Sequence, residues 1–223
     1  MSIVVVSPHF DDAVLSCWSL VDSEDDVQVV TVYTAGPDDP TLISRWDADT
    51  GVTSQVRMQQ RAEENRAALA IAGRSATNLG GLEGQYGDGS VDEKALAAAI
   101  QDAGLVYLPA ATATDEGHVN REHVRVRDAG LRIRPDAWLY ADQPYNHFRA
   151  GLELPADLRE RYSPREEVLL SPEHRERKAR ALGCYAGELQ KLVKAFGLQL
   201  TDPDVLTRET FWQPGTPFNP AAR

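Results

Sequence analysis

Short apolar runs alternate with amphipathic stretches along the chain. The run from Ile3 to Val6 predicts a buried strand, because consecutive apolar residues suit a sheet that is covered on both faces. Apolar residues at helical spacing follow this run and predict a helix: Val14, Leu15, Trp18 and Val21. The stretch 27–34, rich in β-branched residues, predicts the next strand.

The same alternation continues to about residue 196. It predicts further strands near 77–79, 105–108 and 137–140. It also predicts helices that end at Gly73, that follow a capping box at Ser90–Glu93, and that cover 122–131 and 172–196, the last behind a Ser171 cap. Strands that alternate with helices are typical of the α/β class. We therefore expect a Rossmann-like, mostly parallel sheet with helices on both faces and a site at the carboxyl ends of the strands.

The domain organisation is expected to be simple. The 223 residues suit one α/β domain over 1–223, with no internal repeat and no low-complexity linker. Residues from about 155 to 170 are expected to be a charged insertion. Residues from about 200 to 223, with Trp212 and four prolines, are expected to be an irregular tail that packs loosely on the surface.

Composition narrows the function classes. The net charge of −11 argues against nucleic acid and anionic membranes as principal partners, because both need basic patches. No apolar run reaches the roughly 20 residues that span a bilayer, so we expect no membrane insertion. Cys17 and Cys184 imply no disulfide framework, and the N-terminus shows no signal-type segment. We therefore expect a cytoplasmic protein.

Candidate functional residues follow directly after the first predicted strand. Ser7-Pro8 stops the strand, and His9, Asp11 and Asp12 follow at the start of the helix. His9 and Asp12 are three residues apart and can reach one metal ion from the same side, whereas Asp11 is free to act on what the ion holds. Two aspartates here can also be simple helix caps. The added histidine favours a metal site.

A zinc site needs a third protein ligand, and the remaining histidines are limited. His118 and His123 follow the strand that ends near 108, which places them at the same sheet edge as His9. His147 follows the next strand without a companion ligand, and His174 lies in a charged stretch typical of a solvated helix face.

Several motifs resemble the PIG-L/LmbE-like family of zinc-dependent N-deacetylases. Ser7-Pro8-His9-Phe10-Asp11-Asp12 resembles the family's P-H-x-D-D signature, and the Arg61–Glu64 stretch with Ala68 is similar to its R-x-x-E-x-x-x-A helix. Leu82–Tyr86, Asp142–Tyr145 and Lys178–Tyr185 resemble its later motifs, so the resemblance extends to about residue 190.

The resemblance implies a hydrolase that removes an N-acyl group, such as acetyl, from an amino sugar or an amino-sugar conjugate. It implies Zn²⁺ bound by His9, Asp12 and His123, with Asp11 as general base toward a water whose pKa the metal lowers to about 7. His118 is assigned to the oxyanion. Arg61 and Glu64 are expected to form a structural ion pair.

One motif departs from the family. Members usually carry H-x-D-H at the third ligand, whereas this chain reads His118-Val119-Asn120-Arg121-Glu122-His123. Without a gap, Asn120 stands in the place of the first histidine and Glu122 replaces the aspartate. With a two-residue insertion, His118 fills that place instead. Both alignments stay open, and both keep His123 as the ligand.

Two other functions compete with this interpretation. Two histidines and a carboxylate also form the Fe²⁺ site of non-haem oxygenases, although these usually have β-rich folds. A metal-free relative that binds a sugar or acts as a scaffold is the alternative outside metal catalysis. The identity of the acylated amine and the oligomeric state have no readable signal in the sequence.

Overall fold

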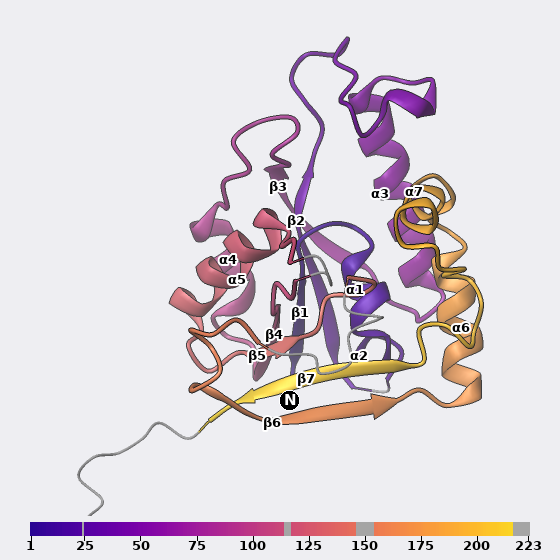
Figure 1. Ribbon diagram of the computed structural model, residues 1–223. Helices are drawn as coiled ribbons and strands as arrows, with labels where there is room; N and C mark the ends of the chain where they lie inside the picture. The colour runs from indigo at the N-terminus through magenta and orange to yellow at the C-terminus, as the bar shows by residue number, and fades with distance from the viewer. Residues whose placement is uncertain (24, 114–116, 146–153, 216–223) are drawn as a thin grey trace, which may run out of the picture.

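The computed structural model describes residues 1–23, 25–113, 117–145 and 154–215. In this part of the chain seven strands form one sheet, in the order β3-β2-β1-β4-β5-β7-β6 (Figure 1). The first five strands in that order are parallel, and β7 and β6 each pair antiparallel with the preceding strand. The strands are β1 (Ile3–Ser7), β2 (Val27–Ala35), β3 (Ala76–Leu82), β4 (Leu105–Pro109), β5 (Trp138–Tyr140), β6 (Tyr162–Leu169) and β7 (Arg208–Pro214). The predicted mostly parallel α/β sheet is confirmed.

Helices cover both faces of this sheet, as predicted (Figure 1). Two of them, α4 and α5, lie on one face, and the other five lie on the opposite face, with the short 3₁₀ helix η1 (Ala48–Thr50) before α3. The helices are α1 (Asp12–Ser16), α2 (Trp18–Val21), α3 (Ser54–Ala70), α4 (Glu93–Ile100), α5 (Arg121–Ile133), α6 (Pro172–Leu182) and α7 (Ala186–Phe196). No helix in the described ranges is long and apolar enough to cross a membrane.

Two apolar cores lie on the two faces of β1. Ile3 and Val5 pack with α1, α2, α3 and the two C-terminal helices, whereas Val4 and Val6 pack with α4 and α5. Successive side chains of a strand point to opposite faces, so the continuous apolar run Ile3–Val6 fills both cores at once. β1 also pairs with β2 on one side and β4 on the other. The chain order reverses at this strand, which is where ligands bind in open α/β sheets.

The predicted charged insertion and irregular tail are the largest errors in the fold. Half of the first segment is β6, and the second segment contains β7, so both extend the sheet beyond β5. Phe211 and Trp212 are buried rather than loosely packed. β6 is an edge strand with charged side chains, which protect an exposed edge from further pairing. Those charges hide the period-two pattern that marks an ordinary strand.

Smaller differences concern where helices begin and end. Asp92, not Ser90, caps α4, since its side chain accepts hydrogen bonds from the Lys94 and Ala95 amides. Ser171 caps α6 as predicted, by accepting from the His174 amide. The single helix expected over 172–196 is two helices, α6 and α7, separated at 183–185. This break turns α7 toward the carboxyl ends of the strands, beside α3 (Figure 1).

Candidate metal centre and cavity

The turn after β1 carries three of the predicted site residues. The Ser7 hydroxyl stabilises this turn, because it donates to the His9 carbonyl oxygen (2.5 Å) and accepts from the Ala13 amide (3.0 Å). The His9 amide donates to Asp12 Oδ2 at 2.7 Å. These local bonds hold His9 and Asp12 on one side of the turn.

The third predicted ligand comes from α5. Asn120 caps this helix by accepting a hydrogen bond from the Glu122 amide (2.9 Å), and His123 follows in the first turn. His123 is buried, and its ring centroid lies 5.3 Å from that of His9. One ligand atom from each of His9, Asp12 and His123 lies within 4.8 Å of the others. The structure thus brings the three predicted ligands into one group.

Each imidazole of this group has one nitrogen held by a carboxylate. His123 Nδ1 lies 2.6 Å from Asp142 Oδ1, and His9 Nε2 lies 2.7 Å from Glu122 Oε2. The other nitrogens face Asp12: His9 Nδ1 is 3.2 Å from Oδ2, and His123 Nε2 is 3.4 Å from Oδ1. The sequence analysis did not assign these roles to Asp142 and Glu122. Only their positions in the sequence could have indicated these roles. Asp142 is the second residue after β5, and Glu122 adjoins His123.

The donor set fits zinc. Although His123 Nε2 is buried, it has no hydrogen-bond partner within the described ranges. Two imidazole nitrogens and a carboxylate oxygen converge, and this is a ligand set that Zn²⁺ binds in catalytic sites. The carboxylates behind the imidazoles fix the ring orientations, as partners of metal-bound histidines do. Asp142 is itself fixed by the Thr112 amide (2.9 Å).

The electrostatics of the group separate the two adjacent aspartates. Burial disfavours the charged form of Asp12, but the charges of His123 and His9 and the hydrogen bond from His9 outweigh it and lower its pKa to about 2. Burial raises the pKa of Asp11 to about 7, helped by the nearby charges of Asp12 and Glu188. Burial favours neutral His9 and His123, yet contacts with acidic partners raise the pKa of both. Asp11 is therefore the carboxyl group suited to proton exchange near neutral pH.

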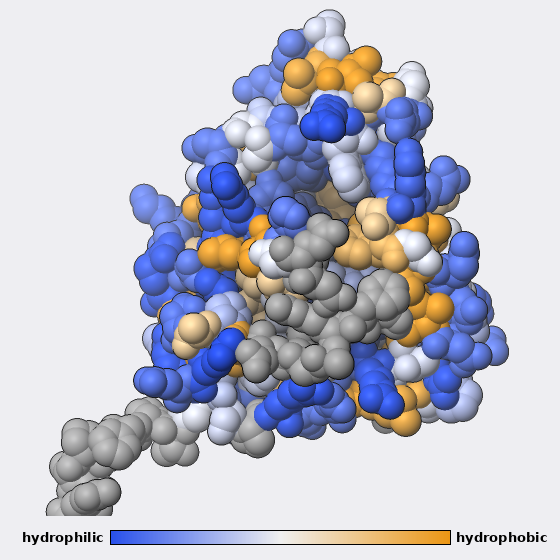
Figure 2. All heavy atoms as spheres, in the orientation of Figure 1, coloured by the Kyte–Doolittle hydropathy of each residue, from blue (hydrophilic) through white to orange (hydrophobic). Residues whose placement is uncertain are grey.

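A cavity of about 480 Å³ opens beside this group, a size typical of small-molecule sites. Hydrophobic residues border the hollow on the side of α7 (Figure 2). The lining is polar near the turn after β1 and apolar along α7. It comprises His9, Phe10, Asp11, Asp12, Leu15, Trp46, Arg61, Glu83, Gln85, Asn120, Glu122, Gln143, Pro144, Tyr145, Tyr185, Glu188, Leu192, Ala195 and Phe196.

The predicted oxyanion residue is placed differently. His118 is exposed and is not among the residues that line the cavity, whereas Asn120 lines it. The Asn120 amide nitrogen also lies 3.5 Å from the Tyr145 hydroxyl. Of the two residues that the open alignments offer, Asn120 is therefore the one that lies at the cavity. His174 lies on α6, outside the cavity lining, and His147 lies outside the described residues.

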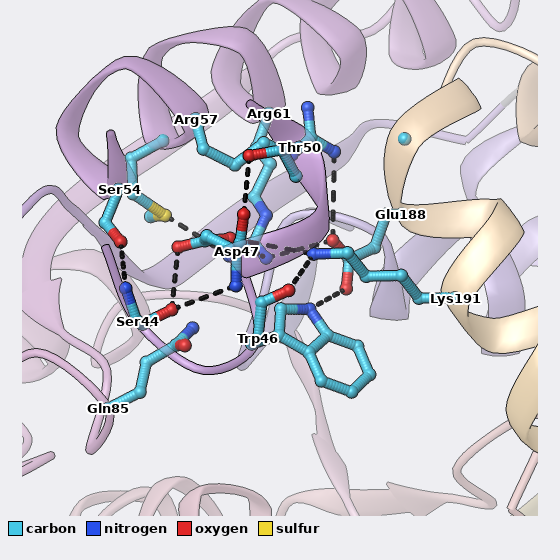
Figure 3. Close-up of polar contacts among 12 residues, drawn as sticks. Ser44, Trp46, Asp47, Thr50, Ser54, Arg57, Arg61, Gln85, Glu188 and Lys191 are labelled. Atoms are coloured by element: carbon cyan, nitrogen blue, oxygen red, sulfur yellow. Dashed lines mark hydrogen bonds and ion pairs between the residues drawn. The ribbon is translucent and has the colours of Figure 1, made fainter. Parts of the chain in front are cut away.

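A buried ion-pair network forms the other side of the cavity (Figure 3). The expected Arg61–Glu64 pair is wrong, because Glu64 pairs with Arg57 at 3.0 Å. Arg61 instead contacts three carboxylates, listed with their distances: Glu83 (3.1 Å), Glu188 (3.0 Å) and Asp47 (3.3 Å). Arg61 thus joins α3 to three other segments at the cavity, a role that its position in the sequence did not reveal.

Comparisons with known proteins give matches in structure alone. The sequence matches no protein-family profile and no curated protein. The deacetylase Dbv21, described for the A40926 pseudoaglycone, is similar over 95% of this chain and 96% of its own, with 27% identity and a TM-score of 0.71. A deacetylase of the teicoplanin biosynthetic pathway is similar over 96% of this chain and 97% of its own, with 23% identity and a TM-score of 0.76.

More distant structures share the fold. The N,N'-diacetylchitobiose deacetylase of Pyrococcus horikoshii is similar over 98% of this chain and 87% of its own, with 14% identity and a TM-score of 0.62. The hydratase GalB of Pseudomonas putida, which acts on 4-carboxy-2-hydroxymuconate, is similar over 97% and 96%, with 17% identity and a TM-score of 0.51. The fold therefore carries more than one reaction, and the residues of the site have to decide between them.

Proposed function

We propose that this chain, which has the fold of the PIG-L/LmbE-like deacetylases, is a zinc-dependent N-deacetylase that acts on an amino sugar or an amino-sugar conjugate. The observation that carries the proposal is the convergence of His9, Asp12 and His123 beside Asp11 at one cavity. The resemblance found in the motifs is confirmed by structural neighbours that are deacetylases. Dbv21, at 27% identity, gives the strongest of these supports.

His9, Asp12 and His123 are the proposed metal ligands. A bound Zn²⁺ ion supplies a water of lowered pKa and polarises the acyl carbonyl group. Glu122 and Asp142 orient the two imidazoles through their hydrogen bonds. Fe²⁺ is the alternative metal for the same set of donors.

Asp11 is the proposed general base. It lines the cavity directly beside Asp12, and a carboxylate next to the metal ligands is placed to take a proton from a water held there. It accepts the proton of the attacking water and returns it to the leaving amine. Acetate, or a related acid, and a free amine are the products.

Asn120 is the proposed donor to the oxyanion, in place of the His118 of the sequence prediction. Its side-chain oxygen is engaged in the α5 cap, which leaves its amide N–H groups to the cavity and to Tyr145. A fixed donor of this kind stabilises negative charge as it develops on the acyl oxygen.

The polar part of the cavity suits a sugar. Arg61, Glu83 and Gln85 line the cavity and offer donors and acceptors, and hydroxyl groups of a hexosamine have both functions. The partner is accordingly a small molecule and not nucleic acid. We further place the protein in the cytoplasm, since both cysteines are free thiols.

The test is direct. The purified protein is analysed for metal, loaded with Zn²⁺, and incubated with a panel of N-acetylated hexosamines and their glycosides, with acetate and free amine both quantified. Equimolar acetate and amine, lost in Asp11→Asn, are the expected result. Absence of metal binding would favour the metal-free alternative, and turnover of an unsaturated carboxylic acid without acetate release would favour a hydratase.

A further inference from the structure

Trp46 is an exposed aromatic side chain at a functional cavity. It lies in the loop between β2 and α3, lines the cavity, and has 42% of its surface exposed. An indole left this exposed adds little to folding by burial, since the free energy gained scales with the apolar area removed from water. The stabilisation of its position therefore has to come from polar contacts.

Several contacts fix the orientation of this indole (Figure 3). Trp46 Nε1 donates to Glu188 Oε1 at 2.8 Å, and Lys191 Nζ donates to the Trp46 carbonyl oxygen. The same ammonium group lies 5.1 Å from the ring centroid, within cation–π range. Glu188 and Lys191 both belong to α7, so the indole is bound to this helix rather than left to move with its loop.

The residue after Trp46, Asp47, fixes the loop to the protein interior. Asp47 is buried and accepts hydrogen bonds from Tyr86 (2.6 Å), Ser44 (2.9 Å) and Arg61 (3.3 Å). A side chain held by a rigid support binds a ligand at lower entropic cost than a mobile one. The loop thus presents Trp46 to the cavity in a preorganised position.

The cavity is apolar on the same side. Leu192, Ala195 and Phe196 of α7 line it together with Trp46. Phe196 contacts Tyr145 edge to face at 5.4 Å between ring centroids, and Tyr145 contacts His123 in the same way at 5.7 Å. An acetyl group held at His9, Asp12 and His123 has a single methyl. That methyl is too small to cover an apolar wall of this extent.

We propose that Trp46 is a specificity-determining residue whose indole packs against an apolar, ring-bearing aglycone of the substrate, opposite the α7 wall. The proposal rests on the proposed deacetylase function. Glu83 and Glu188 both pair with Arg61, and all three line the same cavity, where they offer polar groups to the sugar. In a hexosamine the aglycone at C1 is on the carbon next to the N-acyl group at C2. The apolar wall that a single acetyl methyl leaves uncovered is therefore open to the aglycone.

The experiment compares phenyl and methyl glycosides of N-acetylglucosamine, which differ only in the aglycone. Trp46→Ala is expected to lower kcat/KM for the phenyl glycoside by about tenfold, mainly through KM, and to change the methyl glycoside by less than about twofold. Trp46→Phe is expected to retain most of the preference, because it keeps an aromatic face without the bond to Glu188. Ile43→Ala is the control, since Ile43 lies in the same loop, is exposed and does not line the cavity.

A binding measurement separates this proposal from the deacetylase function. Asp11→Asn is titrated by calorimetry with both glycosides and with an N-octanoyl methyl glycoside, with and without Trp46→Ala. A phenyl preference that disappears with the indole supports the proposal even if neither glycoside is hydrolysed. Equal losses on both glycosides would overturn it, because the indole would then contact the sugar. A loss confined to an N-octanoyl methyl glycoside would also overturn it, since the wall would then hold the acyl chain.

Discussion

The two ends of the cavity are formed by different kinds of structural element. At the metal end, side chains come from the turn after β1, from the start of α5 and from the second residue after β5, all anchored to the parallel sheet. At the α7 end, the walls are a loop and a helix that meet through Trp46, Glu188 and Lys191. The first end has little freedom to change, whereas the second can vary without moving the sheet.

The charges of the two ends also differ. Around the metal group, four carboxyl groups gather with two histidines as the nearest cationic partners: Asp11, Asp12, Glu122 and Asp142. At the α7 end, Arg57, Arg61 and Lys191 balance a similar number of carboxylates. Buried carboxylates require a compensating cation. The α7 end carries its own cations, and the metal end is suited to receive one from solution.

The largest effect is expected from the proposed metal ligands. Asp12→Ala and His123→Ala should each lower zinc affinity by more than about 100-fold, because even partners behind the ligands are worth 10- to 100-fold. Equilibrium dialysis with metal analysis measures this, and circular dichroism checks the fold. His174→Ala, on α6 and away from the cavity, is the matched control. Retention of zinc by both variants would contradict the assignment.

The next largest effect separates base from ligand at the metal end. Asp11→Asn should keep its zinc and lose roughly 10²- to 10⁴-fold in kcat, the usual contribution of a general base. Steady-state kinetics on the zinc-loaded variant give the rate. Metal loss equal to that of Asp12→Ala would mean that the two carboxylates have been assigned the wrong way round.

A third prediction decides between the two open alignments. Asn120→Ser should lower kcat by about 10²-fold, because it removes an amide donor to the oxyanion but keeps an oxygen to cap α5. His118→Ala should change kcat by less than about twofold, since His118 is exposed and outside the cavity lining. The reverse result, with His118→Ala damaging and Asn120→Ser harmless, would restore the original assignment of His118.

The smallest effect on the reaction, but a clear one on stability, is expected at the α7 end. Asp47→Asn should lower the free energy of unfolding by about 3 kcal/mol, because it breaks a buried ionic network, with zinc binding unchanged. Thermal or urea unfolding measures this, and Asp49→Asn, exposed in η1, is the control.

The pH dependence of the difference in unfolding free energy between wild type and Asp47→Asn provides an independent check. Burial opposes ionisation of Asp47, but hydrogen bonds from Tyr86 and Ser54 and the charge of Arg61 outweigh it and lower its pKa. A carboxyl group with a lowered pKa stabilises the fold above its unfolded pKa of about 4, and this contribution is lost as pH falls through the folded value. The stability gap between wild type and Asp47→Asn should therefore narrow below about pH 4. A gap that is constant from pH 7 to pH 3 would show that the charge is not responsible.

Elements whose pattern is local could be predicted from the amino-acid sequence. The apolar run Ile3–Val6 and the turn residues after it are adjacent in the chain, so strand, turn and His9–Asp12 spacing follow from short-range rules. The alternation of strands and helices likewise fixed the α/β class. His123 could be named because its motif continues into the helix that carries it.

The tertiary structure decided what depends on distant partners. β6 and β7 exist because β5 offers an edge to pair with, which no local pattern reveals. Glu122 and Asp142 acquire their roles only when α5 and β5 bring them against the two imidazoles. Trp46 becomes part of the cavity because α7, about 140 positions along the chain, supplies Glu188. Side-chain contacts between segments far apart in sequence leave no periodicity behind, and for this reason they are visible only in the folded chain.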